Sequence, residues 1–233
     1  MKRFFHIALA LVVLCGCSKG YDYSGPTEDL DGRDGANAPG NPYSAIVTVK
    51  QGADSKVFFQ LDENTRLIPQ NYTHPYKGME RVICELTETT SGCFIEWMDF
   101  LEKGAATLAS AVNTDGPAAD LATLSDGVDV LGDWMTTVED GFLTLHYSTW
   151  WGDGLVRHSL SVLTGANPEN PYELWLLHSR AGDAALEEGD ALIYFDINSL
   201  PSTEGEYVTL TLKWLNGEGH ISSRDFRFRT RTE

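Results

Sequence analysis

The residues best able to do chemistry are histidines and carboxylates in the second half of the chain. His146 and His158 fall in two neighbouring strand-like runs, and His178 precedes Asp183 in "LLHSRAGD". Zinc needs side chains that converge on one point, and acid–base catalysis needs a nucleophile beside its base. No G-x-S-x-G, H-E-x-x-H or P-loop motif supplies such a setting. The sequence therefore predicts no catalytic residue, no metal and no cofactor, and gives His178 and Asp183 a loop-fixing hydrogen bond.

Two alternating runs, Phe142–Trp151 and Leu155–Leu163, surround the first two histidines. The Gly-Asp-Gly between the runs indicates a β-hairpin. In a register that buries the apolar rows of both strands, His146 and His158 lie on opposite faces and cannot share one zinc ion. We therefore expect His158 to be a hydrogen-bonded core histidine.

An exposed aromatic side chain is the best candidate for binding. Trp150 and Trp151 are adjacent on one strand, so they point to opposite faces. If Trp151 joins the core, Trp150 stands on the polar face with His146, and the hairpin register adds Arg157. A flat ring flanked by hydrogen-bonding groups can stack on a sugar or form the buried centre of a protein interface. The alternative is that another part of the chain covers Trp150.

Acidic residues dominate the surface chemistry, with 34 carboxylates against 17 basic side chains and a net charge of −17. Such a field repels phosphate backbones, so nucleic acid is not an expected partner. Glu187, Glu188 and Asp190 are predicted to form a solvated acidic turn. The C-terminal "RDFRFRTR" predicts a strand whose basic outer face, with Arg227 and Arg229, protects a sheet edge or docks an acidic partner.

The N-terminus has the pattern of a lipoprotein signal. Met1–Arg3 is basic, and the apolar run at residues 4–14 is too short to span a bilayer. Leu14-Cys15-Gly16 before Cys17 resembles a lipobox. We expect cleavage after a 1–16 signal peptide and acylation of Cys17, which gives a multi-chain membrane anchor.

Residues 17–42 are rich in Gly, Pro, Asn and Asp and contain few aliphatic side chains. This composition predicts a flexible acidic tether after the acylated cysteine. Ser18 stands where many inner-membrane lipoproteins carry Asp, so the outer membrane is the expected location.

The strand pattern predicts an all-β chain with two units. Five short runs in residues 43–103 suggest a small OB-like β-barrel, and regular runs over 127–233 predict an antiparallel β-sandwich. The Ala-rich segment 104–126 between them reads as a joint, with a short helix around Ala105–Val112.

Cys84 and Cys93 lie on either side of a probable turn in "CELTETTSGC". A turn centred at Glu88 and Thr89 places the two thiols opposite each other and permits a disulfide. A turn centred at Ser91 leaves them as two separate buried side chains.

The chain also resembles a known family. The segments "VFFQLDENTRLIP", "YKGMERVICELT", "DGVDVLGDWMTTVEDGFLTLHY", "ELWLLHSRAGD" and "LIYFDINSL" are similar, in this order, to NigD-like lipoproteins of Bacteroidota. The resemblance implies an OB-like domain, a C-terminal β-sandwich and an envelope location, but no particular activity. The long Ala-rich segment and the pair Cys84 and Cys93 depart from the family pattern.

Together these features predict a non-catalytic lipoprotein of the outer membrane that works as a binding or accessory module. Its membrane contact is the lipid anchor, and its partner is an envelope protein. A glycan bound at Trp150 is the alternative, and an envelope hydrolase is the weaker third hypothesis.

Overall fold

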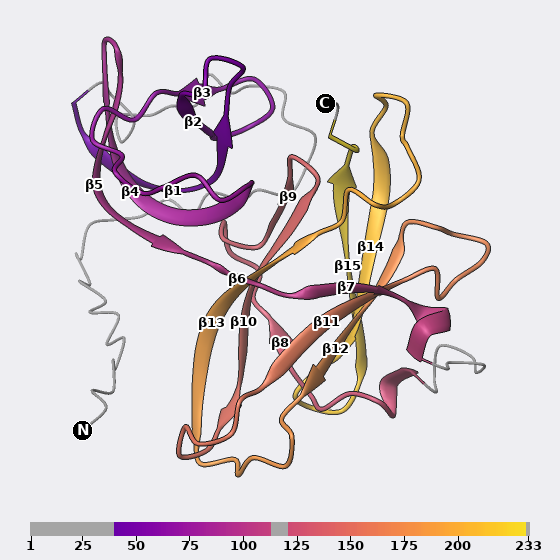
Figure 1. Cartoon of the computed structure of the whole chain (residues 1–233). Coiled ribbons are helices and arrows are strands. Elements are labelled where there is room, and N and C mark those ends of the chain that lie inside the picture. The colour runs from indigo at the N-terminus through magenta and orange to yellow at the C-terminus, as the bar shows by residue number, and fades with distance from the viewer. Residues whose placement is uncertain (1–39, 113–120, 232–233) are drawn as a thin grey trace.

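The computed structural model describes residues 40–112 and 121–231, which form three five-stranded β-sheets (Figure 1). Within these ranges the helical elements are limited to one 3-10 turn, η1 (Ala109–Val112), and a short helical stretch at 121–122. The all-β prediction is confirmed. The predicted signal peptide, Cys17 and most of the tether lie outside the described residues.

The first sheet has the strand order β3-β2-β1-β4-β5. Alternating apolar side chains of β1 and β4 fill its concave side, including Val47, Val49, Val82 and Leu86. The sheet contains β1 (Pro42–Gln51), β2 (Val57–Gln60), β3 (Arg66–Leu67), β4 (Glu80–Thr89) and β5 (Gly92–Phe100).

The two edges of this sheet meet at a single point. Pro69 forms a parallel bridge with Cys93, and the Cys93 amide donates to the Ile68 carbonyl at 2.9 Å. Gly92 permits this approach, because an added Cβ would overlap the Ile68 carbonyl. A continuous closing ladder does not form, since β3 is two residues long and the proline that follows has no N–H to donate. The predicted OB-like β-barrel is therefore corrected to a curled, open sheet.

The hairpin between β4 and β5 closes at Thr89 and Gly92. This register pairs Cys84 with Met98 and leaves Cys93 opposite Glu88, and both thiols are free. The disulfide expectation is therefore wrong. Burial raises the pKa of Cys84 to about 12 and that of Cys93 to about 11, so both act as small apolar side chains.

The other two sheets pack face to face as a sandwich. One has the order β6-β13-β10-β8, with β9 also paired to β10, and the other has the order β15-β14-β12-β11-β7. The first contains β6 (Glu102–Lys103), β8 (Asp129–Val130), β9 (Thr137–Glu139), β10 (Phe142–Trp151) and β13 (Glu187–Asp196). The second contains β7 (Ala105–Leu108), β11 (Ser159–Thr164), β12 (Glu173–Ser179), β14 (Val208–Leu215) and β15 (Ile221–Phe228).

Three strand pairs of the sandwich are parallel, so the predicted antiparallel arrangement holds only in part. They are β6 with β13, β7 with β11, and β12 with β14. The last arises because the chain leaves β12 for the opposite sheet, forms β13 there, and returns beside β12.

The predicted hairpin of β10 and β11 is also wrong. β10 pairs with β13, β8 and β9, whereas β11 pairs with β12 and β7. Each strand has one apolar row, and the rows meet across the core, as Leu145 and Val162 do within one cluster. The loop after Trp151 therefore crosses from one sheet to the other.

The Ala-rich segment belongs to the sandwich. β6 and β7 add to opposite sheets, and Gly104 lies at the crossing, where an added Cβ would overlap the Phe195 ring. A strand thus replaces the first half of the expected helix, and the 3-10 turn replaces the second. Further along, Leu121 is buried with Trp175 on the outside of the second sheet.

A buried arginine joins the N-terminal sheet to the sandwich. Arg81 on β4 is fully buried, and its guanidinium donates to Thr48 Oγ1 at 3.1 Å, Thr144 Oγ1 at 3.3 Å and Glu139 Oε2 at 3.3 Å. Lys50 Nζ lies 2.7 Å from Asp140 Oδ1 at the same junction. The two units are therefore connected by fixed polar contacts.

Candidate functional site

The outer face of β10 and β13 extends from this junction to the far end of the sandwich. Direct pairing places Thr144 beside Tyr194, Ser148 beside Asp190, and Trp150 beside Glu188. Arg81 covers the Thr144 end. Arg81 does not cover the opposite end of this face, where Trp150 lies.

The polar side chains in the middle of this face are paired with one another. His146 Nδ1 lies 2.5 Å from Asp133 Oδ2, and its Nε2 lies 2.8 Å from Asp190 Oδ2. The Ser148 hydroxyl donates to Glu188 Oε1 at 2.8 Å. These contacts fix the carboxylates in place and leave His146 mostly buried.

Trp150 is 48% exposed, and Leu186 is 66% exposed. The Leu186 amide donates to the Trp151 carbonyl at 2.9 Å, which extends the pairing of β13 with β10 by one step. Leu186 therefore lies on the same face as Trp150, diagonal to it. We call Trp150, Leu186, Glu188 and Asp190 the Trp150 surface.

Arg157 does not join this surface. It lies in the loop between β10 and β11, and its guanidinium pairs with Glu102 on β6. The expected proximity to Trp150 depended on the hairpin register, which does not form.

Beneath the end of the sandwich, four groups form a buried hydrogen-bonded line. Asp183 Oδ2 lies 3.1 Å from His158 Nε2, and His158 Nδ1 lies 3.2 Å from His178 Nε2. His178 Nδ1 then lies 3.2 Å from the Gly127 carbonyl oxygen. Trp151 stacks on the His158 ring at 4.3 Å. The prediction of a buried, hydrogen-bonded His158 is confirmed. The predicted hydrogen bond between His178 and Asp183 is wrong, because His158 lies between them.

Asp183 also holds two loops. Its carboxylate accepts from the Gly152 amide at 2.8 Å and from the Ala184 amide at 2.9 Å. Gly152 is required here, because an added Cβ would overlap the carboxylate. The hydrogen bond from Gly152 lowers the pKa of Asp183, and burial lowers the pKa of His178.

The carboxylates Glu187, Glu188 and Asp190 lie on β13 and not in the predicted turn. They form no metal site: within residues 40–112 and 121–231, no cluster of His, Cys, Asp and Glu side chains is arranged to hold a metal ion. The same ranges contain no helix long and apolar enough to cross a bilayer.

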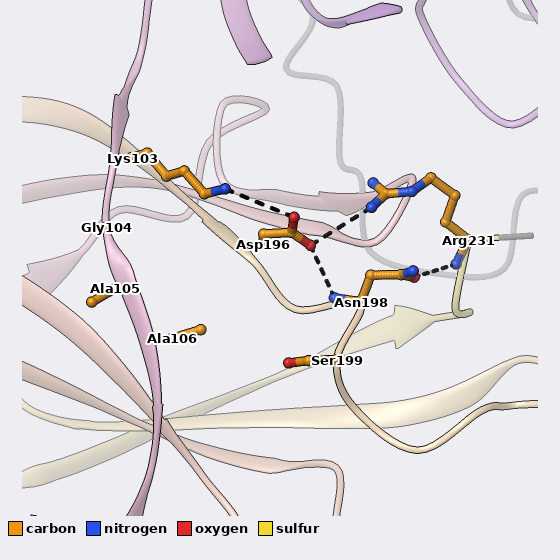
Figure 2. A pocket seen from close by; sticks show the side chains of 8 residues that line it. All are labelled: Lys103, Gly104, Ala105, Ala106, Asp196, Asn198, Ser199 and Arg231. Atoms are coloured by element: carbon orange, nitrogen blue, oxygen red, sulfur yellow. Dashed lines mark hydrogen bonds and ion pairs between the residues drawn. The ribbon is translucent and has the colours of Figure 1, made fainter. Parts of the chain in front are cut away.

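A pocket of about 560 Å³ opens beside the crossing of β6 and β7 (Figure 2). Its lining charges are already paired, since Asp196 lies 3.8 Å from Lys103 Nζ and 3.7 Å from Arg231 Nη2. The Asn198 side chain accepts from the Arg231 amide at 2.6 Å. These contacts stabilise the loop that follows β13.

The basic C-terminal strand β15 is an edge of its sheet, as predicted. Arg227 and Arg229 lie over the Tyr207 ring at 3.4 and 4.8 Å. Arg229 also binds Glu63 of the N-terminal unit at 2.8 Å, and Tyr207 donates to the same carboxylate. Arg229 and Tyr207 therefore help to hold the two units together.

Three residues of the site and junction were missed from the sequence: Asp133, Leu186 and Arg81. The role of each depends on a residue from another strand or loop. A signal was available only for Leu186, an apolar residue directly before an acidic run.

The fold and this surface define an all-β protein in which an open, curled sheet is fixed to a β-sandwich with one aromatic, acidic end. Residues 111–228 match the family described as the NigD-like C-terminal beta sandwich domain. The chain belongs to this NigD-like family, which confirms the resemblance found in the sequence.

Solved structures from related bacteria share the fold. A protein of Parabacteroides distasonis described as toxin-related has a TM-score of 0.65 at 22% identity, and 82% of this chain covers 94% of that one. A NigD-like immunity protein of Bacteroides caccae has a TM-score of 0.55 at 18% identity, with 80% and 97% covered. A protein of Bacteroides fragilis, proposed to be a lipoprotein, has a TM-score of 0.55 at 11% identity, with 82% and 100% covered. A comparison with curated proteins gives no match.

Proposed function

We propose that this protein is a non-catalytic envelope lipoprotein that binds a protein partner through the Trp150 surface. The observation that carries the proposal is the exposure of Trp150 and Leu186 at diagonal positions on one face of a strand pair. Exposed aromatic and aliphatic side chains that lie together are typical centres of protein interfaces.

The charges around this centre indicate what the partner presents. Glu188 and Asp190 on β13 lie next to Trp150. Asp133 contacts His146 on the same face. Carboxylates at the rim of an interface favour a partner with basic side chains and speed its association. The proposed partner therefore carries an apolar contact bordered by Lys or Arg.

The structural neighbours support a protein partner. One is named an immunity protein and another is described as toxin-related, and both descriptions fit proteins that act through other proteins. The lipid anchor at Cys17 would hold this chain in the outer membrane, where such a partner is met. Cys17→Ser is expected to move the protein from the membrane fraction to the soluble fraction.

Site-specific photocrosslinking in living cells tests the proposal. A photoreactive phenylalanine analogue at Trp150 is expected to capture one reproducible protein, and the same analogue at Phe94 is the control. Phe94 is 45% exposed and lies on β5 of the other unit. Equal capture at both positions, or none at Trp150, would contradict the proposal.

A glycan is the second candidate partner. The indole of Trp150 could stack on a sugar ring while the Glu188 and Asp190 carboxylates accept hydrogen bonds from its hydroxyls. Envelope polysaccharide would then quench tryptophan fluorescence, and Trp150→Ala would remove the change. Quenching that persists in the variant would exclude this site.

A further inference from the structure

The buried line from Asp183 to Gly127 is bounded by hydrogen-bond acceptors at both ends. The Asp183 carboxylate accepts at one end, and the Gly127 carbonyl accepts at the other. Three contacts of 3.1–3.2 Å connect these ends through the His158 and His178 rings. Each contact is a hydrogen bond only if one proton lies between its two atoms.

Counting protons shows that two neutral rings cannot satisfy the line. A neutral imidazole carries one N–H, so two rings supply two protons for three contacts. We infer that His158 and His178 together hold three protons, and that the resulting positive charge balances Asp183 and locks the loops beside the Trp150 surface. The significance of this lock for binding at the Trp150 surface rests on the proposed function.

The two outer protons lie on His158 Nε2, facing Asp183, and on His178 Nδ1, facing the Gly127 carbonyl oxygen. The middle proton could sit on either ring, and we place it on His158 Nδ1, because the Asp183 carboxylate contacts His158 directly and stabilises the positive charge there. The single proton of His178 is then on Nδ1, where it meets the Gly127 carbonyl oxygen. Burial lowers the pKa of His178, which supports a neutral ring at this position.

Two further charged groups act on this line. Arg180 lies close enough to oppose a charge on His178, and its guanidinium donates to the Asp183 backbone carbonyl at 2.7 Å. Asp126 favours a charge on His178 and accepts from the Arg180 amide at 2.7 Å. Trp151, which stacks on His158, carries no charge. Asp183 is the carboxylate in direct contact with the His158 ring.

The proton count is coupled to the binding surface through Asp183. Its carboxylate holds the amide of Gly152, two residues after Trp150, and that of Ala184, two residues before Leu186. Loss of the third proton leaves two lone pairs in contact and an unbalanced carboxylate in the interior. A fourth proton places one N–H against another. The loops are therefore fully held in the three-proton state alone.

Long-range ¹H–¹⁵N NMR of the imidazole nitrogens in the full folded chain tests the assignment. We expect two protonated nitrogens on His158, and on His178 a protonated Nδ1 with a bare Nε2. The exposed His220 provides an internal reference for the imidazole signals. Two neutral rings at every pH at which the protein is folded would overturn the inference, and a doubly protonated His178 would overturn the placement of the charge on His158.

Amide hydrogen exchange tests the lock. When the third proton is lost, the Asp183 carboxylate has no counter-charge in the interior and is expected to turn toward water, away from the Gly152 amide. The protection factor of that amide should then fall at least tenfold, the lower end of the range for one hydrogen bond to a charged group. Asp183→Asn keeps an acceptor for Gly152 but removes the balancing charge, so the pH dependence should disappear. Protection that follows pH equally in both proteins would overturn the lock.

These measurements are made without a partner, so the two proposals can fail separately. Neutral rings would remove the lock and leave a cross-link at Trp150 standing. If NMR finds three protons on the two rings but Trp150 gives no cross-link, the proton assignment stands and the proposed function is wrong.

Discussion

Replacing Arg81 by Met tests whether one buried guanidinium joins the two units. The variant loses hydrogen bonds to Thr48, Thr144 and Glu139 and leaves the Glu139 carboxylate without its counter-charge. Removing one partner of a buried ion pair costs about 3–5 kcal/mol. Because the Glu139 side chain keeps 24% exposure, water offsets part of this, and we expect a loss of about 3 kcal/mol.

Urea and thermal unfolding measure this loss. For a chain of this size, about 3 kcal/mol corresponds to a decrease in Tm of roughly 6–12 °C. Arg66→Met is the matched control, because Arg66 is exposed on β3, and its effect should stay within about 0.5 kcal/mol. The double variant Arg81→Met/Glu139→Gln should recover part of the stability, since no charge is left uncompensated.

The pH dependence of the free energy of unfolding provides a second test of the ion pair between Arg81 and Glu139. Burial raises the pKa of Glu139 above its ordinary value of 4.5, against the opposing effect of Arg81. A carboxyl whose folded pKa is raised adds stability below its unfolded pKa, and that stability is lost as the pH rises through the folded pKa. Without Arg81 this pKa rises further, so the Arg81→Met defect should be smaller at pH 5 than at pH 8. A defect under 1 kcal/mol, or one independent of pH and of Glu139→Gln, would refute the reasoning.

Three further predictions follow from the fold. Gly104→Ala should lower the free energy of unfolding by about 1–3 kcal/mol, because the new methyl overlaps the Phe195 ring, and an unchanged urea midpoint would contradict this. Cys84 and Cys93 should react with a thiol reagent only after unfolding, and reductant should leave the Tm unchanged; rapid labelling of the native protein would argue against their burial. Trp150→Ala should change stability by less than about 0.5 kcal/mol, since the ring is half exposed, and a larger loss in denaturant titration would indicate a structural role instead.

Local alternation predicted the faces of the strands correctly. Trp150 was placed outward and Trp151 toward the core from a period of two, which depends only on backbone geometry. The partners of the same strand were predicted wrongly. The Gly-Asp-Gly turn signal favoured pairing of β10 with β11. The apolar row of each strand is buried equally well when the two strands face each other across the core, in different sheets.

The parts that sequence could not provide depend on distant contacts. Ala105–Leu108 has little intrinsic preference for a strand and becomes one because β11 offers an open edge. Burial of the Arg81 charge is energetically unfavourable unless Glu139 lies beside it. The residues near Arg81 in the chain do not indicate that Glu139 is its partner. The link between His158 and His178 likewise requires two strands of one sheet to be in register.

The crossing at Gly104 affects the order in which the protein folds. β6 and β7 pair with strands that lie much later in the chain, since Glu102 pairs with Ile193 and Ala105 pairs with Ser161. Pairings between distant residues are slow, because a long loop must close before any contact forms. The strands of the N-terminal sheet are consecutive in the chain. This sheet can therefore be complete while β6 and β7 are still unpaired. The sandwich should therefore form last, and until it does, its unpaired strand edges are open to aggregation that a chaperone would prevent.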